Sequence, residues 1–248
     1  MDQGTGAALE VASSEAGRGV RAWDAPTRLF KWTLVALVAA AWATHEYGDP
    51  TLTWHKRTGY AILVLLVFRL LWGVVGSSTA RFSAWVSPPW TALRYGLDLL
   101  RGRPRPYLSH NPLGAWMILA LMAFVGSQAV AGLFTVDSNG IFGGPFANDD
   151  PFSDPTPWQR LMTRYHHQAF NVLLALIAVH VGVNLFYQFV KGDPIIRAMI
   201  TGRKPVEPFA DQAEMVPARA SALRALACLG LAAAIVLGGI KVFGGSLT

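Results

Sequence analysis

Cysteine is nearly absent from this sequence. The 248 residues include one cysteine, Cys228, which excludes an intrachain disulfide and any zinc or iron–sulfur site that needs several thiolates. Metal chemistry in this chain must therefore rest on its six histidines.

Charged residues are also scarce. They make up 15% of the chain, whereas 52% of the residues are hydrophobic and the mean hydropathy is +0.34. This balance is too apolar for an ordinary water-soluble domain and predicts an integral membrane protein. Five apolar stretches approach the roughly 20 residues that a helix needs to cross a bilayer: residues 29–45, 58–76, 114–134, 168–190 and 222–244.

Residues 1–22 lack the continuous apolar segment of a secretory signal peptide. They are mostly small and polar, so we expect a flexible cytoplasmic tail. The first apolar stretch itself would then direct membrane insertion.

The net charge of +6 is distributed in a way that predicts membrane topology and no nucleic-acid partner. Three Lys and Arg residues precede the first apolar stretch, five lie between the second and third, and five lie between the fourth and fifth. The opposite ends of the stretches carry five in all. Because positive loops stay in the cytoplasm, we expect a cytoplasmic N-terminus and a periplasmic C-terminus.

The order of the apolar stretches predicts an all-α fold. We expect a four-helix up-down transmembrane bundle in residues 23–204, a linker in 205–221, and a fifth transmembrane helix with a short tail in 222–248. Asp24, followed by Pro26, has the pattern of a helix start. Residues 90–102, WTALRYGLDLLRG, have the pattern of a short amphipathic helix at the inner membrane surface.

Two histidines bracket the fourth apolar stretch in RYHHQAFNVLLALIAVH, residues 164–180. Their spacing of fourteen residues is about four helical turns, or about 21 Å of rise, so His166 and His180 share a face at two depths. The same count along the second stretch leads from His55 to Arg69. We therefore expect an outer level with His55 and His166, and an inner level with Arg69 and His180, near which Lys31 also lies.

Ionisable groups in the bilayer interior cost a few kcal/mol each and usually serve a function. The histidines fit three interpretations: hydrogen-bonded core residues, members of a proton path, or axial ligands of heme. Pairing on facing helices at a shared depth favours heme, because two imidazoles must approach one iron from opposite sides.

Several segments in order resemble the bacterial cytochrome b561 and nickel–iron hydrogenase cytochrome b family. They are WDAPTRLFKW, WHKRTGYAILVLLVFRLLWGVVGSSTARF, HNPLGAWMILALM, the H-x13-H pair and RAMITGRK, which together cover residues 22–204. The resemblance implies a four-helix cytochrome of the bacterial inner membrane with two b hemes. It also implies electron transfer between quinone and a periplasmic partner, such as a cytochrome c or another redox protein. On this resemblance, His55 and His166 ligate the outer heme and His180 the inner one.

One position departs from the family's pattern. Its first helix usually reads R-x-F-H-W, whereas residues 28–32 are RLFKW, which places Lys31 where the partner of His180 is expected. A neutral lysine amine can bind iron, and burial favours the neutral form. Alternatively, the inner heme is five-coordinate, takes another ligand such as His110, or is absent, leaving Lys31 to pair with a propionate or a lipid phosphate.

Other polar residues suggest supporting roles. Arg28 and Arg69 are candidates for binding the inner heme's propionates, because a guanidinium binds a carboxylate with two hydrogen bonds. His110 would hydrogen-bond a propionate or a quinone, or simply supply polarity at a helix start. The segment between the third and fourth stretches is acidic and is either a docking surface for a cationic partner or a solvated loop: Asp137, Asp149, Asp150 and Asp154.

The function predicted from the sequence is one-electron transfer between the quinone pool and a periplasmic acceptor or donor. Whether the chain is an enzyme by itself stays open. One alternative is a stand-alone superoxide:quinone oxidoreductase, for which Lys56 and Arg57 beside His55 would attract the anion. Another is a heme-free transporter or assembly factor that uses the same polar residues as a proton or substrate path.

Overall fold

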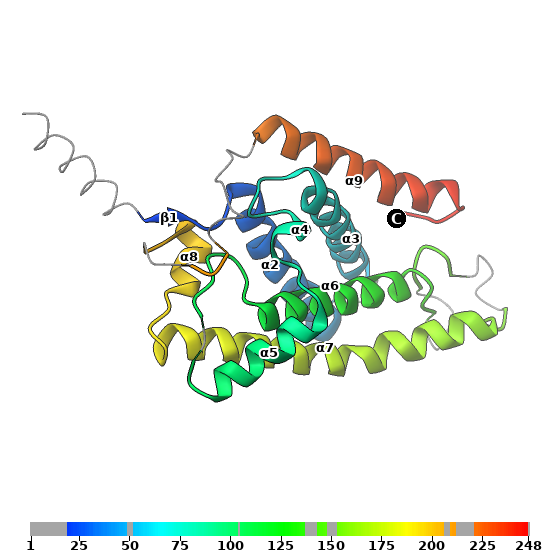
Figure 1. Cartoon of the computed structure of the whole chain (residues 1–248). Helices are drawn as coiled ribbons and strands as arrows, with labels where there is room; N and C mark the ends of the chain where they lie inside the picture. Colours follow the sequence, from blue (N-terminus) through cyan, green and yellow to red (C-terminus); the bar gives the residue numbers. More distant parts are fainter. Residues whose placement is uncertain are drawn as a thin grey trace, which may run out of the picture.

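The computed structural model describes residues 19–48, 52–103, 105–136, 143–147, 153–205, 209–211 and 221–247. The described part is mostly helical (Figure 1). The helices are α2 (Ala25–Tyr47), α3 (Thr53–Val75), α4 (Phe82–Trp85), α5 (Pro89–Leu100), α6 (Pro112–Gly132), α7 (Pro157–Phe189), α8 (Ile195–Thr201) and α9 (Ala222–Val242). The all-α prediction missed one short ladder, formed by β1 (Val20–Arg21) and β2 (Arg203–Lys204).

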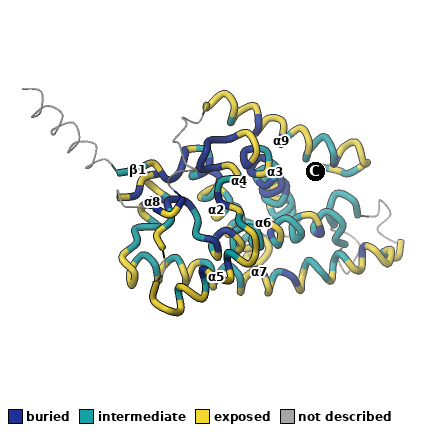
Figure 2. Tube along the Cα trace, viewed as in Figure 1, coloured by how far each residue is buried: buried dark blue, intermediate teal, exposed yellow. Residues whose placement is uncertain are grey.

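Four of the described helices are long and apolar enough to cross a membrane: α3, α6, α7 and α9. In α6 and α7 only 11% of the most apolar window is buried inside the protein; most residues of α6 are half-buried, and many residues of α7 are exposed (Figure 2). Such a surface suits lipid, whereas in water it would favour association. The first expected span, residues 29–45, corresponds to α2, which does not meet this criterion, so its crossing of the membrane stays a prediction.

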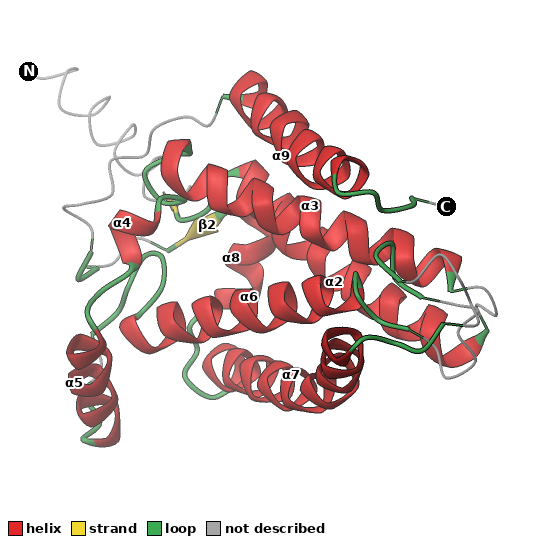
Figure 3. Cartoon of the chain, turned by 90° about the vertical axis from the view of Figure 1, so that its right-hand side faces the viewer, coloured by secondary structure: helices red, strands yellow, loops and turns green. Residues whose placement is uncertain are grey.

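The long helices alternate in direction along the chain. α2 packs on α3, α3 on α6, and α6 on α7, while α9 lies along α3 (Figures 1 and 3). α3 is the central helix, with Trp72 fully buried and Arg69 only 4% exposed. α2 and α7 face each other across the pocket described below, and the closed four-helix up-down bundle stays a prediction.

The starts of the helices follow from local capping. The Asp24 carboxylate accepts a hydrogen bond from Thr27 N at 2.7 Å, and Asn111 caps α6 in the same way. Thr156 and Gln159 form a capping box that begins α7 at Pro157. The apolar stretch predicted from the sequence begins only at residue 168, because the preceding turns of α7 are polar.

The flexible tail predicted over residues 1–22 is wrong for residues 20–21, which form the strand β1. Residues 1–18 lie outside the described part, whereas Val20 pairs with Lys204 and Arg21 with Arg203 across the two strands. The backbone N–H groups of Ala22 and Trp23 both donate to Gly202 O. This short ladder holds the start of α2 against the end of α8.

The predicted linker, residues 205–221, lies largely outside the described residues. One described residue in it, Asp211, accepts hydrogen bonds from Leu108 N and Ser109 N, at 2.7 and 3.2 Å. This carboxylate holds the loop before α6. Amphipathic α5 agrees with the prediction over residues 90–102 and packs against α6.

Candidate functional site

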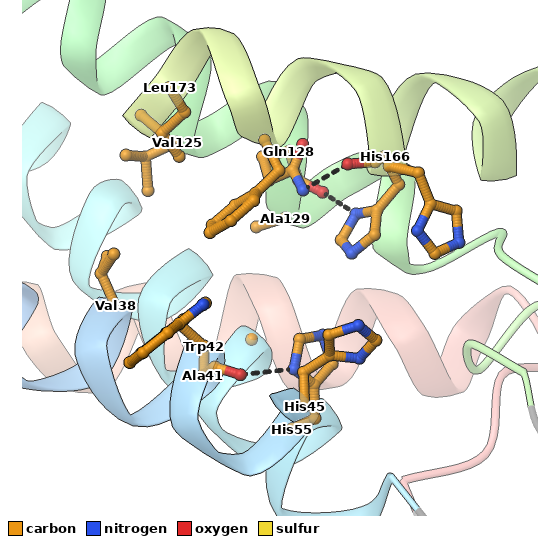
Figure 4. Close-up of a pocket in the computed structure, with 13 residues that line it drawn as sticks. Val38, Ala41, Trp42, His45, His55, Val125, Gln128, Ala129, His166 and Leu173 are labelled. Carbon is orange, nitrogen blue, oxygen red and sulfur yellow. Dashed lines mark hydrogen bonds between the residues drawn. The ribbon is translucent and has the colours of Figure 1, made fainter. Parts of the chain in front are cut away.

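His55 and His166 meet in a pocket lined by residues of α2, α3, α6 and α7. His55 lies in the first turn of α3 and His166 in α7, and their ring centroids are 6.1 Å apart with planes at 88°. Figure 4 shows the His55 ring on the side of α2 and α3, facing His166 across the pocket. The structure thus brings the two residues of the predicted outer level together.

Both rings are oriented by backbone carbonyls of neighbouring helices. His55 Nδ1 lies 2.8 Å from Ala41 O of α2, and His166 Nδ1 lies 2.8 Å from Gln128 O of α6. Because a carbonyl oxygen only accepts, each Nδ1 carries the hydrogen, and each neutral ring keeps its lone pair on Nε2. Metal-bound histidines are usually fixed in this way by a partner on the second nitrogen.

The distance between the rings also fits a shared iron. Two imidazoles bound to one metal ion at about 2.0 Å would place their ring centroids roughly 6.4 Å apart, close to the 6.1 Å found. Gly59 lines the same pocket, and a Cβ added there would meet no atom within 4 Å. The wall of the pocket beside the histidines therefore leaves open space for a flat ring.

His45 and His167 complete a cluster of four imidazoles. The His45 ring lies 5.6 Å from that of His55 and 6.5 Å from that of His167. Within the described ranges, no group of three or more His, Cys, Asp or Glu side chains has the arrangement of a metal-ion site. The cluster therefore fits two imidazoles on a heme iron, with two more at the rim, better than a bare metal ion.

A second polar cluster lies at the inner level. Lys31 Nζ lies 3.4 Å from the centroid of the Trp23 ring, and the His110 ring is 4.7 Å from the same indole. The His110 ring also lies 5.0 Å from Trp85, over which the Arg69 guanidinium is placed at 5.6 Å. Lys31, Arg69 and His110 thus meet around two tryptophans.

Several donors in this cluster are buried and have no hydrogen-bond partner: Lys31 Nζ, Arg69 Nη1, Trp23 Nε1 and Trp85 Nε1. A buried donor without an acceptor costs free energy, and a buried unpaired cation costs more. Such an excess of donors fits an acceptor or an anion that the protein does not itself supply. A heme propionate has this chemistry.

His180 approaches the same level from α7. Its Nε2 lies 3.3 Å from Asn184 Nδ2, which also donates to the backbone oxygen of His180 at 2.7 Å. Asn184 was missed from the sequence, although a polar residue one turn after His180 in an apolar run was a usable signal. The Asn184 amide thus contacts both the ring and the backbone of the candidate ligand within α7.

His110 precedes α6 and is enclosed by protein. Burial lowers the pKa of His110 well below its ordinary value, and the positive charges nearby act in the same direction. The imidazole is therefore neutral at pH 7 and able both to donate and to accept one hydrogen bond.

The two arginines predicted to bind propionates differ in position. Arg69 joins the inner cluster, whereas Arg28 lines a separate cavity beside α9, where its Nη1 donates to Ile200 O. Arg28 Nε is buried without a hydrogen-bond partner. Asp24 lies at the start of α2, the helix that carries Arg28, and it contacts Trp72 of α3, the helix that carries Arg69. The Oδ2 atom of Asp24 accepts hydrogen bonds from Trp72 Nε1 and Ser77 Oγ.

The predicted acidic docking surface is largely outside the described residues. This applies to Asp137, Asp149 and Asp150, whereas Asp154 is described and exposed. The interpretation of this segment stays a prediction.

Apolar helices that bring two imidazoles together at the spacing of a shared heme iron are typical of membrane proteins of the b-type cytochrome class. The family model for prokaryotic cytochrome b561 matches residues 22–202, and the chain belongs to this family. No solved structure matches the chain.

Curated relatives carry a more specific name. The chain is 26% identical over 215 residues to a "Probable Ni/Fe-hydrogenase B-type cytochrome subunit" of Azotobacter chroococcum mcd 1, and the match covers 74% of this chain and 87% of that protein. The same values hold for the protein of this name in Azotobacter vinelandii. A third, from Rhizobium leguminosarum bv. viciae, is 24% identical over 223 residues, covering 75% and 89%. The chain is accordingly a membrane b-type cytochrome of electron transfer.

Proposed function

We propose that this cytochrome carries single electrons between the quinone pool and a periplasmic redox partner through two buried b hemes. The observation that carries the proposal is the His55–His166 pair, with its carbonyl-fixed Nδ1 atoms and its spacing. A bound heme supplies a one-electron change at its iron, while the protein sets position, burial and hydrogen bonding.

The outer heme would be held by the Nε2 atoms of His55 and His166. The carbonyls of Ala41 and Gln128 turn these imidazoles and fix a hydrogen on each Nδ1, which leaves Nε2 to face the iron. Apolar residues of four helices surround the pair and exclude water, which disfavours a change of charge and so tunes the potential.

The inner heme would be held by His180 and Lys31. Support comes from two buried atoms of the cluster that have no hydrogen-bond partner, Lys31 Nζ and Arg69 Nη1. The neutral Lys31 amine would bind the iron, and a propionate would accept a hydrogen bond from Arg69 and offset its charge. Arg28 lines a separate cavity beside α9, so Arg69 and not Arg28 is the propionate donor in this proposal. Neutral His110 would hydrogen-bond a propionate or the head of a quinone.

The names of the relatives suggest a partner for the periplasmic side. They are called subunits of a Ni/Fe hydrogenase, so we propose that the partner is a redox enzyme of this kind or a cytochrome c. The distribution of the basic residues favours a cytoplasmic N-terminus and a periplasmic C-terminus in a bacterial inner membrane, and this orientation is part of the proposal. The pocket with His55 then opens toward the partner.

A second candidate function uses the same scaffold without a partner. Lys56 and Arg57 follow His55 directly, and the Arg57 guanidinium lies 5.2 Å from the Trp54 ring centroid. Their charges would attract superoxide to the outer site, as a superoxide:quinone oxidoreductase requires.

The test begins with a reduced-minus-oxidised absorption spectrum of the full chain in detergent. A b-type band that a quinol reduces supports electron transfer, and its absence would instead favour a heme-free transporter or assembly factor. Superoxide is then supplied to the protein with quinone but without a partner. Rapid superoxide consumption would favour the stand-alone enzyme, whereas its absence favours a subunit that needs a partner.

A further inference from the structure

Two pairs of residues tie α6 to α7 beside the outer histidines. His166 Nδ1 donates to Gln128 O at 2.8 Å, and the Gln128 side-chain Nε2 donates to His166 O at 2.7 Å (Figure 4). One residue earlier on each helix, the hydroxyls of Ser127 and Tyr165 lie 2.7 Å apart. Gln128 therefore holds His166 twice, once through the imidazole ring and once through the backbone.

The hydrogen bond from the Gln128 side chain requires one orientation of its amide. Turning the amide over would place Oε1, which only accepts, against the carbonyl oxygen of His166. In the orientation found, Oε1 is buried and has no hydrogen-bond partner. An unpaired buried acceptor costs free energy, so the contact with His166 O outweighs that cost.

Gly132, the last residue of α6, lies against the His166 ring. A Cβ added to this glycine would be 3.0 Å from His166 Cε1 and 3.3 Å from Nδ1, closer than the roughly 3.5–4.0 Å of an ordinary carbon contact. Gly132 does not have a positive φ, so the backbone itself does not require a glycine here. The missing side chain instead leaves room for the imidazole in its observed orientation.

These contacts restrict the rotation of the His166 ring. Across the pocket, the His55 ring is fixed separately by Ala41 O of α2. The planes of the two rings are at 88° to each other. Because each ring is turned by a different neighbouring helix, this near-perpendicular angle is set by the protein around the rings.

We propose that Gly132 and the side chain of Gln128 position His166 as an iron ligand and set the angle between the two imidazole planes at the outer heme. This inference rests on the outer heme of the proposed function. Both are positioning residues, because they act on the iron only through His166. Perpendicular imidazole planes leave two iron d orbitals nearly equal in energy, and a low-spin ferric heme then gives a highly anisotropic electron paramagnetic resonance signal.

The first experiment uses Gly132→Ala in the full, heme-loaded chain. The added methyl group must turn the His166 ring, so we expect the largest g value of the outer heme to decrease. The matched control is Gly126→Ala on the same helix, where a Cβ would lie 3.6 Å from Leu66 Cδ1, an ordinary contact. The control should keep the signal of the wild type.

The second experiment isolates the side chain of Gln128. Gln128→Met keeps the length of the side chain and the backbone carbonyl, but it removes the donor to His166 O. When heme is titrated into the heme-depleted full chain, we expect the affinity of the outer site to fall about tenfold, as for other residues that orient a metal ligand. Gln168→Met, at an exposed position of α7, should keep the affinity.

The outcomes separate this inference from the outer heme itself. A Gly132→Ala signal equal to that of Gly126→Ala, or an unchanged heme affinity in Gln128→Met, would overturn the positioning role, even where His166→Ala loses the heme. If Gly132→Ala does not fold, the affinity of Gln128→Met decides alone. A wild-type chain without an anisotropic bis-imidazole signal would contradict the outer heme and this inference together.

Discussion

The rings of His55 and His166 face each other at a centroid distance of 6.1 Å, and each is held at Nδ1 by a carbonyl of another helix. The imidazoles come from α3 and α7, and the carbonyls of Ala41 and Gln128 come from α2 and α6. One pair of residues thus connects four long helices at a single site. A group bound between the rings would contribute to the stability of all four.

Gly59 tests whether the pocket holds a flat group. Replacement by Phe meets no protein atom near the Cβ, so the apo fold should tolerate it, but the ring would occupy the space beside the histidines. We expect Gly59→Phe to lose the outer heme. Heme per polypeptide, measured by the pyridine hemochrome assay, checks this.

Gly182 provides the matched control. It lies in α7, it is exposed, and a Cβ there would also meet no atom within 4 Å. Gly182→Phe should leave the heme content unchanged. Equal heme content in the two variants would contradict the placement of the outer heme.

Lys31 tests the inner site. If its amine ligates iron, Lys31→Ala should lower the heme content from two per chain toward one, while Lys31→His keeps two. The electron paramagnetic resonance spectrum of the oxidised Lys31→His protein should gain a second bis-imidazole signal. Lys191→Ala, at the exposed end of α7, serves as the control. A wild-type chain with one heme, unchanged in Lys31→Ala, would remove the lysine from the site.

Substitution of Asp24 tests how much the hydrogen bonds between the start of α2 and the buried part of the protein contribute to stability. Its buried carboxylate accepts from Thr27 N, Trp72 Nε1 and Ser77 Oγ. Asp24→Ala leaves these donors unsatisfied, and we expect a loss of about 3 kcal/mol in unfolding free energy. Thermal unfolding in detergent measures this, with the exposed Asp98→Ala as control. A shift no larger than that of the control would show that the buried carboxylate contributes little.

The lowered pKa of His110 predicts that the unfolding free energy of the protein depends on pH. Its folded-state pKa is lowered by burial and by neighbouring positive charges, so an unfolded chain binds a proton more readily than the folded one. Stability is then fully present above the unfolded value of about 6.5 and falls as the pH decreases below it. The charged or titratable groups that act on it come from α2, α3, α7 and β2: Lys31, Arg69, His180 and Lys204.

The measurement is thermal unfolding of the full chain from pH 7.5 to 5. His110→Asn keeps polarity but cannot titrate in this range, so its melting temperature should fall less on acidification than that of the wild type. Parallel pH profiles of the two proteins would contradict a neutral buried His110.

The depth of each histidine could be predicted from the sequence because helical rise is fixed. Counting fourteen residues from His166 to His180, and from His55 to Arg69, gave an outer level with His55 and His166 and an inner level with Arg69 and His180. The structure brings His55 and His166 together, and Arg69, His180 and Lys31 all act on the charge of His110. The start of α2 also followed from Asp24 and Pro26, since capping is local chemistry.

Other features depend on tertiary contacts and had no local signal. The carbonyls of Ala41 and Gln128 that turn the imidazoles are backbone atoms, so no residue type indicates them. The pairing of Arg21 with Arg203 joins distant short segments in which like charges oppose strand formation. The second role of Asp24, binding Trp72 and Ser77, requires the fold itself.

The most direct test of the central claim is the heme content of His166→Ala compared with that of His167→Ala. These neighbours lie on the same helix, but only His166 has its Nδ1 fixed by Gln128 O while facing His55. We predict that His166→Ala loses one heme per chain and the bis-imidazole signal of the outer site, whereas His167→Ala keeps both. Retention of the full heme content and an unchanged spectrum in His166→Ala would contradict the account.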